Sequence, residues 1–322
     1  MKKILGVCLA ALAGGVFSAH AQTYPSRPIT LVIPLAAGST ADILARAIQP
    51  GLSKQLGQTV IVDNKAGGSG LIAMQYVANA NPDGYTLVMG SNNTWAINKG
   101  LFKSLPYDPQ KDFKPVAYLA GASNVLIVKP DSPYDSVKAL VAAMKAQPEK
   151  LTFSSGGNGT THHLSSEYLK ALADTKATHI PYRGAPQGVT AVMAGETNFG
   201  FYNTPSVSGL VNDGKLKALA TTGEARSSLL PNVPTMAEAG VAGYVISVDL
   251  GILAPAGTPD AVVERLNQAV RTVMNEPAFH RKLQGLGYEV FRDDSPAQFG
   301  QFIQTDIDKW VPLVVQSGAR VD

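Results

Sequence analysis

Two short segments of small and hydroxyl-bearing residues could bind an anion in this 322-residue chain. The first follows the apolar run 31–33 and consists of Ala37, Gly38, Ser39 and Thr40. The second begins at the end of the run 151–154 and offers Ser154, Ser155, Asn158, Thr160 and Thr161. A strand that enters a helix through such residues leaves N–H groups without intrahelical acceptors, and the helix dipole favours an anion there, by roughly 0.3–1 kcal/mol when exposed. We therefore expect two halves of a site for an organic acid, the structural alternative being capped turns or flexible glycine loops.

Other candidate ligand contacts follow further predicted strands or lie at a predicted domain crossing. They are Ser91, Asn92 and Asn93 after the third strand, Tyr182 after the strand 178–180, Tyr202 with Asn203, and Asp249. Ser91 and Asn92 could equally form an Asx turn, and Asp249 could accept from a ligand hydroxyl or brace a hinge. Beside Tyr182 stands Arg183, whose guanidinium suits bidentate carboxylate recognition but which could be only a surface residue.

The elements that must position these residues alternate between strand and helix. Apolar β-rich runs predict strands at 31–33, 59–63, 85–89, 125–128, 151–154, 178–180, 199–202 and 218–220. Amphipathic stretches predict helices at 41–56, 71–79, 137–146, 164–172, 259–274, 277–285, 296–309 and 311–317. This alternation indicates an α/β protein with mixed, mostly parallel sheets flanked by helices.

Two domains are expected, because the chain is long and has two short strand-like crossings at 120–124 and 245–249. Domain one would comprise residues 22–124 plus 246–322, and domain two residues 125–245. Crossings of a few residues suit hinges around a closing cleft.

The amino terminus has the pattern of a secretory signal peptide over residues 1–21. Lys2 and Lys3 precede an apolar stretch, and Ala19-His20-Ala21 is an A-x-A cleavage pattern, so cleavage after Ala21 is expected. The single cysteine lies in this segment, and a mature chain without disulfides would depend on its core alone. Removal of the two lysines lowers the formal charge from +3 to +1, which argues against nucleic-acid binding and membrane-surface attachment.

Patterns that suggest other chemistry are weak. Residues 68–73 fit a G-x-G-x-x-A dinucleotide pattern after a strand, but a lone match in an exported chain favours an ordinary βα turn, so no cofactor is expected. His163 and Glu167 have helical spacing beside His162 but lack a third ligand nearby, so no metal is expected. The sequence has no G-x-S-x-G elbow or P-loop lysine, which removes the usual grounds for proposing catalytic residues.

The order of motifs along the chain resembles that of the Bug family, the periplasmic receptors of tripartite tricarboxylate transporters. The motifs are Tyr24-Pro-Ser-Arg-Pro-Ile29, Val62-Asp-Asn-Lys-Ala-Gly-Gly68, Pro82-Asp-Gly-Tyr-Thr-Leu87, Leu105-Pro-Tyr-Asp-Pro109, Ser155-Gly-Gly-Asn-Gly-Thr160, Ile180-Pro-Tyr-Arg-Gly184, Leu230-Pro-Asn-Val-Pro-Thr235 and Leu253-Ala-Pro-Ala-Gly-Thr-Pro259. The chain departs from the family pattern at Ala36-Ala-Gly-Ser39, where Pro-Ala-Gly-Gly is usual, and at Tyr202, where an acidic residue is frequent. A tyrosine in the cleft would favour an aromatic or uncharged ligand body.

The resemblance implies a two-domain, Venus-flytrap fold and a non-catalytic, monomeric protein that captures a small carboxylate and delivers it to a polytopic membrane permease from the periplasm. Two alternatives stay open from the sequence. The same capture could serve a membrane sensor kinase, or the chain could be a periplasmic enzyme acting on a carboxylate.

Overall fold

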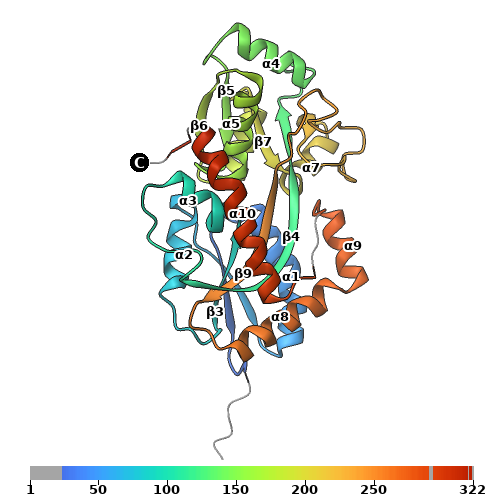
Figure 1. Ribbon diagram of the computed structural model, residues 1–322. Coiled ribbons are helices and arrows are strands. Elements are labelled where there is room, and N and C mark those ends of the chain that lie inside the picture. Colours follow the sequence, from blue (N-terminus) through green and yellow to red (C-terminus); the bar gives the residue numbers. More distant parts are fainter. Residues whose placement is uncertain (1–23, 290–292, 318, 321–322) are drawn as a thin grey trace, which may run out of the picture.

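Two lobes lie one above the other in the computed structural model, which describes residues 24–289, 293–317 and 319–320 (Figure 1). The predicted signal peptide and its cleavage site lie outside these residues. Within them, no helix combines the length and the apolar character needed to cross a membrane.

Lobe one, at the bottom of Figure 1, is built from both ends of the described chain. Its elements are β1 (Ile29–Ile33), α1 (Thr40–Leu56), β2 (Val60–Asn64), the short helix η1 (Gly68–Gly70), α2 (Leu71–Ala78), β3 (Thr86–Ser91), the π-helical turn η2 (Asn93–Ile97), α3 (Asn98–Leu101), α8 (Asp260–Met274) and α9 (Pro277–Gly285). Strand β1 pairs in parallel with β2 and β3, so the loops that follow these strands open at one edge of the sheet.

Lobe two contains the middle of the chain. Its elements are α4 (Val137–Ala146), β5 (Thr152–Ser155), α5 (Thr161–Ala173), β6 (Thr178–Pro181), α6 (Ala185–Ala194), β7 (Phe199–Asn203), α7 (Thr204–Asn212) and β8 (Lys217–Thr221). Strand β5 pairs in parallel with β6 and β7, and the loops after these strands face lobe one.

Two long strands join the lobes: β4 (Phe113–Val128) and β9 (Ser247–Pro255). Strand β4 pairs antiparallel with β9 up to Ser123, and with β7 and β8 from Asn124 onward, so one strand belongs to both sheets (Figure 1). The resulting strand order is β2-β1-β3-β9-β4-β7-β5-β6, with β8 also on β4. Two parallel sheets extended by antiparallel crossing strands confirm the predicted two-domain α/β fold.

The last helix, α10 (Pro296–Ser317), lies diagonally along β4 and reaches α5 of lobe two (Figure 1). The sequence predicts two helices here, but α10 continues through Pro312, although a proline inside a helix removes one N–H donor and crowds the carbonyl four residues earlier. Its buried Phe299 and Val314 belong to a hydrophobic cluster that also holds Phe153 of lobe two. The lobes therefore share core along this face as well as two strands.

Candidate functional site

A small cavity lies between the lobes, with a volume of about 30 Å³; we call it the central cavity. Both lobes contribute to its wall, which holds hydroxyls, amides and one imidazole but no charged carboxylate, lysine or arginine among the described residues. The lining residues are Leu35, Ser39, Thr40, Ser91, Asn93, Gly156, Thr160, Thr161, His162, Gly184, Ala185, Asn203 and Val248.

The amino ends of four helices meet at this cavity. Thr40 begins α1, Thr161 begins α5, Ala185 begins α6, and Asn203 is the residue before α7. The first N–H groups of each helix lack intrahelical acceptors, and each helix dipole places positive potential at its amino end. Four such ends around one cavity without acidic side chains form an environment suited to an anion.

The loop before α1 is fixed from within lobe one. Gly38 adopts φ +77°, a conformation that side chains other than glycine rarely take, and its N–H donates to Asp42 at 2.9 Å. Burial opposes ionisation of Asp42, but hydrogen bonds from Arg46 and Gly38 outweigh burial and hold the pKa of this carboxyl below its usual range. Ser39 caps the helix by accepting the Asp42 N–H at 3.4 Å. The loop is thus preformed, with Asp42 already paired.

The glycine loop before α5 is held by two histidines. Nδ1 of His162 accepts the Gly156 N–H at 3.3 Å, and Nδ1 of His163 accepts the Gly159 N–H at 3.1 Å. Thr160 caps α5 by accepting the His163 N–H at 3.4 Å. Burial lowers the pKa of His162 to about 4, so the ring is neutral at pH 7 and carries its proton on Nε2.

Asn203 connects the two lobes at the centre of the site. Its Oδ1 accepts from Thr40 Oγ1 of lobe one and from His162 Nε2 of lobe two, each at 2.9 Å. Its Nδ2 donates to Asn124 of the crossing strand β4 and, at 3.4 Å, to Thr161 Oγ1. Four partners fix the amide orientation, and the Thr40–Asn203 bond exists only while the lobes are together.

On the lobe-one side, the end of β3 and the start of η2 reach the cavity. Ser91 and Asn93 line it, and the buried Asn93 Oδ1 has no hydrogen-bond partner, while its Nδ2 donates to Ser69 O at 3.0 Å. An unpaired buried acceptor is costly, so this oxygen is available for a ligand hydroxyl or a water molecule.

Some residues predicted for the site lie elsewhere. Tyr202 is fully buried in the lobe-two core, where its hydroxyl donates to Ser154 Oγ at 2.8 Å and Ser154 donates to Gly188 O at 3.0 Å. Tyr202 does not line the central cavity, so the sequence-based argument that it favours an aromatic ligand body loses its support. Neither Tyr202 nor Ser154 is among the residues that line the central cavity.

Asn92 and Asp249 belong to a buried network beside the crossing strands. Asn92 donates to Ser247 O at 2.9 Å, and Asp249 accepts from Tyr118 at 2.8 Å and from Ser247 Oγ at 3.1 Å. Neither lines the central cavity. This network ties Asp249 to both crossing strands, which favours the hinge-bracing alternative that the sequence left open.

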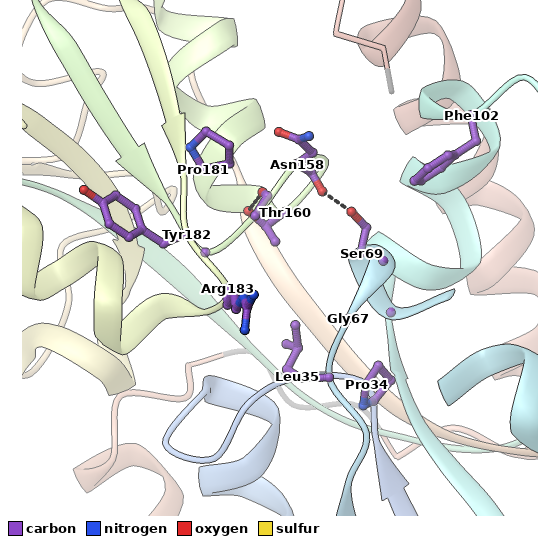
Figure 2. A pocket seen from close by; sticks show the side chains of 15 residues that line it. Pro34, Leu35, Gly67, Ser69, Phe102, Asn158, Thr160, Pro181, Tyr182 and Arg183 are labelled. Carbon is purple, nitrogen blue, oxygen red and sulfur yellow. Dashed lines mark hydrogen bonds between the residues drawn. The ribbon is translucent and has the colours of Figure 1, made fainter. Parts of the chain in front are cut away.

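A larger cavity of about 520 Å³ adjoins the central cavity; we call it the outer cavity (Figure 2). Leu35, Gly156 and Thr160 line both cavities. The predicted site residues Asn158 and Tyr182 lie here, not at the central cavity. The remaining lining residues are Pro34, Ala66, Gly67, Gly68, Ser69, Gly70, Phe102, Gly157, Pro181 and Arg183.

The lobes also touch across the outer cavity. Ser69 Oγ of lobe one donates to Asn158 O of lobe two at 2.6 Å, as the dashed line in Figure 2 marks. Ser69 has φ +56°, and its own carbonyl accepts from Asn93 and from Asn98 at 3.1 Å. The glycine-rich segment that fits a dinucleotide pattern is therefore part of the contact between the lobes.

Several wall residues of the central cavity were not among the residues predicted to bind ligand: Leu35, Gly156, His162, Gly184, Ala185 and Val248. His162 was considered only as a metal ligand, although its position in the first turn of α5 already placed it beside the predicted loop. Gly184 lies against lobe one, since a Cβ added there would come 3.1 Å from Ala36 Cβ. In the described part of the chain, no three His, Cys, Asp or Glu side chains group closely enough to hold a metal ion.

Two α/β lobes joined by crossing strands, with a cavity between them, define the class of periplasmic solute-binding proteins. The structure of R. palustris Rpa4515 with adipate has a TM-score of 0.89 and 33% identity, covering 92% of this chain and 100% of that chain. MatC (Rpa3494) from Rhodopseudomonas palustris with bound malate has a TM-score of 0.86 and 30% identity, covering 90% of this chain and 100% of that chain.

The family is shown by sequence. Residues 44–319 match the tripartite tricarboxylate transporter family receptor. BugT of Bordetella pertussis is 32% identical over 319 residues, which cover 99% of this chain and 97% of BugT. The chain therefore belongs to the tripartite tricarboxylate transporter receptors, the Bug family of periplasmic solute-binding proteins, as the order of its motifs predicts.

Proposed function

We propose that this receptor captures a small organic carboxylate in the central cavity and delivers it to a polytopic membrane permease. The observation that carries the proposal is the convergence of four helix amino ends on a cavity without acidic side chains. The carboxylate would accept hydrogen bonds from main-chain N–H groups of α1 and α5 and from the hydroxyls of Ser39, Thr40 and Thr161. The adipate and malate bound by the two structural relatives support a carboxylate as the ligand class.

Capture requires the lobes to separate and close again. At about 30 Å³ the central cavity has room for only about two water molecules, fewer atoms than an organic acid brings. We propose that residues 22–124 with 246–322 move against residues 125–245 about the crossing strands β4 and β9. The ligand drives closure only to the extent that it binds the closed state better than the open one.

We propose binding without turnover, by a monomer, after export to the periplasm with cleavage following Ala21. The family and the two ligand-bound relatives are binding proteins, which supports this proposal. Recovery of a bound carboxylate chemically unchanged after long incubation is the expected result, and a converted product would contradict it.

A thermal-shift screen of mono- and dicarboxylates tests the proposed ligand class. At about 100 times its dissociation constant, a bound acid adds roughly 2.7 kcal/mol to the free energy of unfolding, which raises the melting temperature measurably. The matching amides of the same acids serve as uncharged controls. Stabilisation by amides but by no acid would contradict the anion site.

A further inference from the structure

We propose that His162 and His163 position the glycine loop for anion capture, and that they do so only as neutral rings, so that acid weakens capture. The glycine loop comprises residues 156–160, between β5 and α5. Both histidines are positioning residues, which act on the ligand through the loop. This inference rests on the proposed function and names the regulation of the same site.

Ring nitrogens without a proton hold one side of the glycine loop. Gly156 and Gly159 donate their N–H groups to Nδ1 of His162 and of His163, at 3.3 and 3.1 Å. The fit is close, since a Cβ on Gly156 would come 2.9 Å from His162 Nδ1. A protonated imidazole carries a hydrogen on both nitrogens and accepts no hydrogen bond. Protonation of either ring therefore removes one loop hydrogen bond and turns two N–H groups toward each other.

The other side of the glycine loop faces lobe one. Asn158 O accepts from Ser69 Oγ, as Figure 2 shows, and a Cβ on Gly159 would collide with Leu101 at the end of α3. Thr160, at the end of the loop, lines both cavities. A displaced loop would therefore change both the wall of the anion site and the contact between the lobes.

The surroundings of His162 oppose a charge on its ring. The ring faces that of Tyr202 on β7, with 4.8 Å between the centroids, and its Nε2 donates to Asn203 Oδ1. Burial raises the pKa of Tyr202, so neither neighbour is an anion that could stabilise a protonated imidazole. His162 is only 7% exposed, and burial lowers its pKa to about 4.

His163 lies in a cluster with one acid, one lysine and a second histidine. Its ring stacks on His179 of β6, with 4.0 Å between the centroids, so two protonated rings would repel each other. Glu167 Oε1 lies 3.6 Å from His163 Nε2, but Lys170 donates to both oxygens of Glu167 at 2.8 Å and already pairs this carboxylate. Burial, and next the charge of His163, lower the pKa of His179 to about 3, so His179 is neutral in the closed form above about pH 5.

Separation of the lobes changes the cost of a proton on His162. The ring forms part of the cavity wall, so an open cleft exposes it to water, and its pKa should rise toward the ordinary value of about 6.5. The closed form thus has the lower pKa. Its stability relative to the open form is complete above about pH 6.5 and is lost as the pH falls toward about 4. For one such ring, affinity should fall by up to about tenfold between pH 7.5 and pH 5.5, because a proton must leave before closure.

Nitrogen-15 NMR of the histidine rings tests the positioning contacts without a ligand. The described part of the chain contains four histidines, His162, His163, His179 and His280, so single substitutions assign each signal. At pH 7.5 we expect His162 and His163 to carry their proton on Nε2 and to have an unprotonated Nδ1. A proton on Nδ1 of either ring at this pH would overturn the inference, because that ring could not accept from the loop.

Titration calorimetry at pH 7.5 and pH 5.5 tests the effect on capture. The probes are adipate, malate and the acid with the largest thermal shift in the screen. The proteins are the wild type, His162→Asn, His163→Asn, the double variant and the control His280→Asn, which changes a histidine of α9 outside both cavities. Asparagine carries an oxygen acceptor near the position of Nδ1 but does not titrate.

We expect the wild type and His280→Asn to lose affinity alike toward pH 5.5, by up to about tenfold for each ring that must lose a proton. Each single variant should bind more weakly than the wild type at pH 7.5, because the contacts of Nε2 are lost, but its affinity should fall less steeply. In the double variant, only the fall caused by the acid's own ionisation should remain. That ionisation, and the titration of Asp306, are common to all five proteins and cancel in the comparison.

The outcomes separate this inference from the proposed function. If the wild type binds an acid but its affinity falls no more steeply than that of the double variant, the inference is wrong while carboxylate capture stands. A double variant that does not fold leaves the decision to the single variants and to the ring NMR, where a proton on Nδ1 refutes the contacts. If no acid binds the wild type at pH 7.5, the proposed function itself fails.

Discussion

The substitution Thr40→Val tests how much of ligand affinity depends on contact between the lobes. Thr40 is 3% exposed, and its hydroxyl donates across the interface to Asn203 Oδ1 at 2.9 Å. Valine keeps the shape and the β-branch, and Asn203 Oδ1 retains its bond from His162, so no buried acceptor is left without a partner. Thr40 Oγ1 also contacts Ser206 Oγ at 3.3 Å, but Ser206 is only half-buried and can bond to water instead. The main loss is therefore the hydrogen bond to Asn203, about 0.5–1.5 kcal/mol, taken from the closed state alone.

A cost of this size weakens a ligand that binds the closed state by about twofold to tenfold. Calorimetric titration with an acid found in the screen measures the change, and solution scattering without ligand should show a larger mean radius for Thr40→Val. The control Thr190→Val removes a hydroxyl that bonds only to Pro186 O of its own helix on an exposed face, and should change neither quantity. Wild-type affinity together with wild-type dimensions in Thr40→Val would refute the reasoning.

Three other substitutions give distinct expectations. Burial, and next the charge of Asp249, raise the pKa of Asp306 to about 7. The stability that the protonated carboxyl contributes is therefore full below about pH 4 and is lost as the pH rises through about 7. Asp306→Asn should remove this loss, so its melting temperature should differ from that of the wild type by an amount that grows from pH 5 to pH 8. Tyr202→Phe should lower the melting temperature by the value of one buried hydrogen bond and leave ligand affinity unchanged; a change in affinity would place Tyr202 in the site. Ser69→Ala removes the bond to Asn158 O and should speed ligand release in stopped-flow displacement, whereas unchanged release would exclude Ser69 as a contact that holds the lobes closed.

The loops before α1 and α5 could be predicted from the sequence because small and hydroxyl residues between a strand and a helix favour a capped helix start, which leaves N–H groups free. The alternation of side chains along a strand, which can be read from the sequence, also places Tyr202 and Asn203 on opposite faces of β7. Neighbouring residues of a strand point to opposite faces, so both could not line one cavity. Asn203 lines the central cavity, and Tyr202 packs in the core.

The helices α6 and α7 were not predicted, and their amino ends complete the wall of the central cavity. Each is short and contains an interior glycine, Gly188 or Gly209, which lowers intrinsic helix propensity by about 1 kcal/mol. Packing of α6 and α7 against β4 and β7 compensates for this low helix propensity. Packing of this kind cannot be inferred from local propensity.

The full length of β4 could not be predicted from the local sequence pattern either. Pro115 and Gly121 interrupt the expected strand signal, and the register with β9 shifts beyond Pro115 and beyond Tyr118. Only pairing with a strand more than a hundred residues later defines this element, so the crossing appeared in the sequence as a short segment.

The central claim is that a ligand carboxylate rests among the amino ends of α1, α5, α6 and α7. The most direct measurement is a crystal structure of the protein with an acid found in the screen. We expect carboxylate oxygens within hydrogen-bond distance of first-turn N–H groups of α1 and α5, reached directly or through one water molecule. An acid group that lies only in the outer cavity, away from Ser39–Thr40 and Thr160–Thr161, would contradict the account.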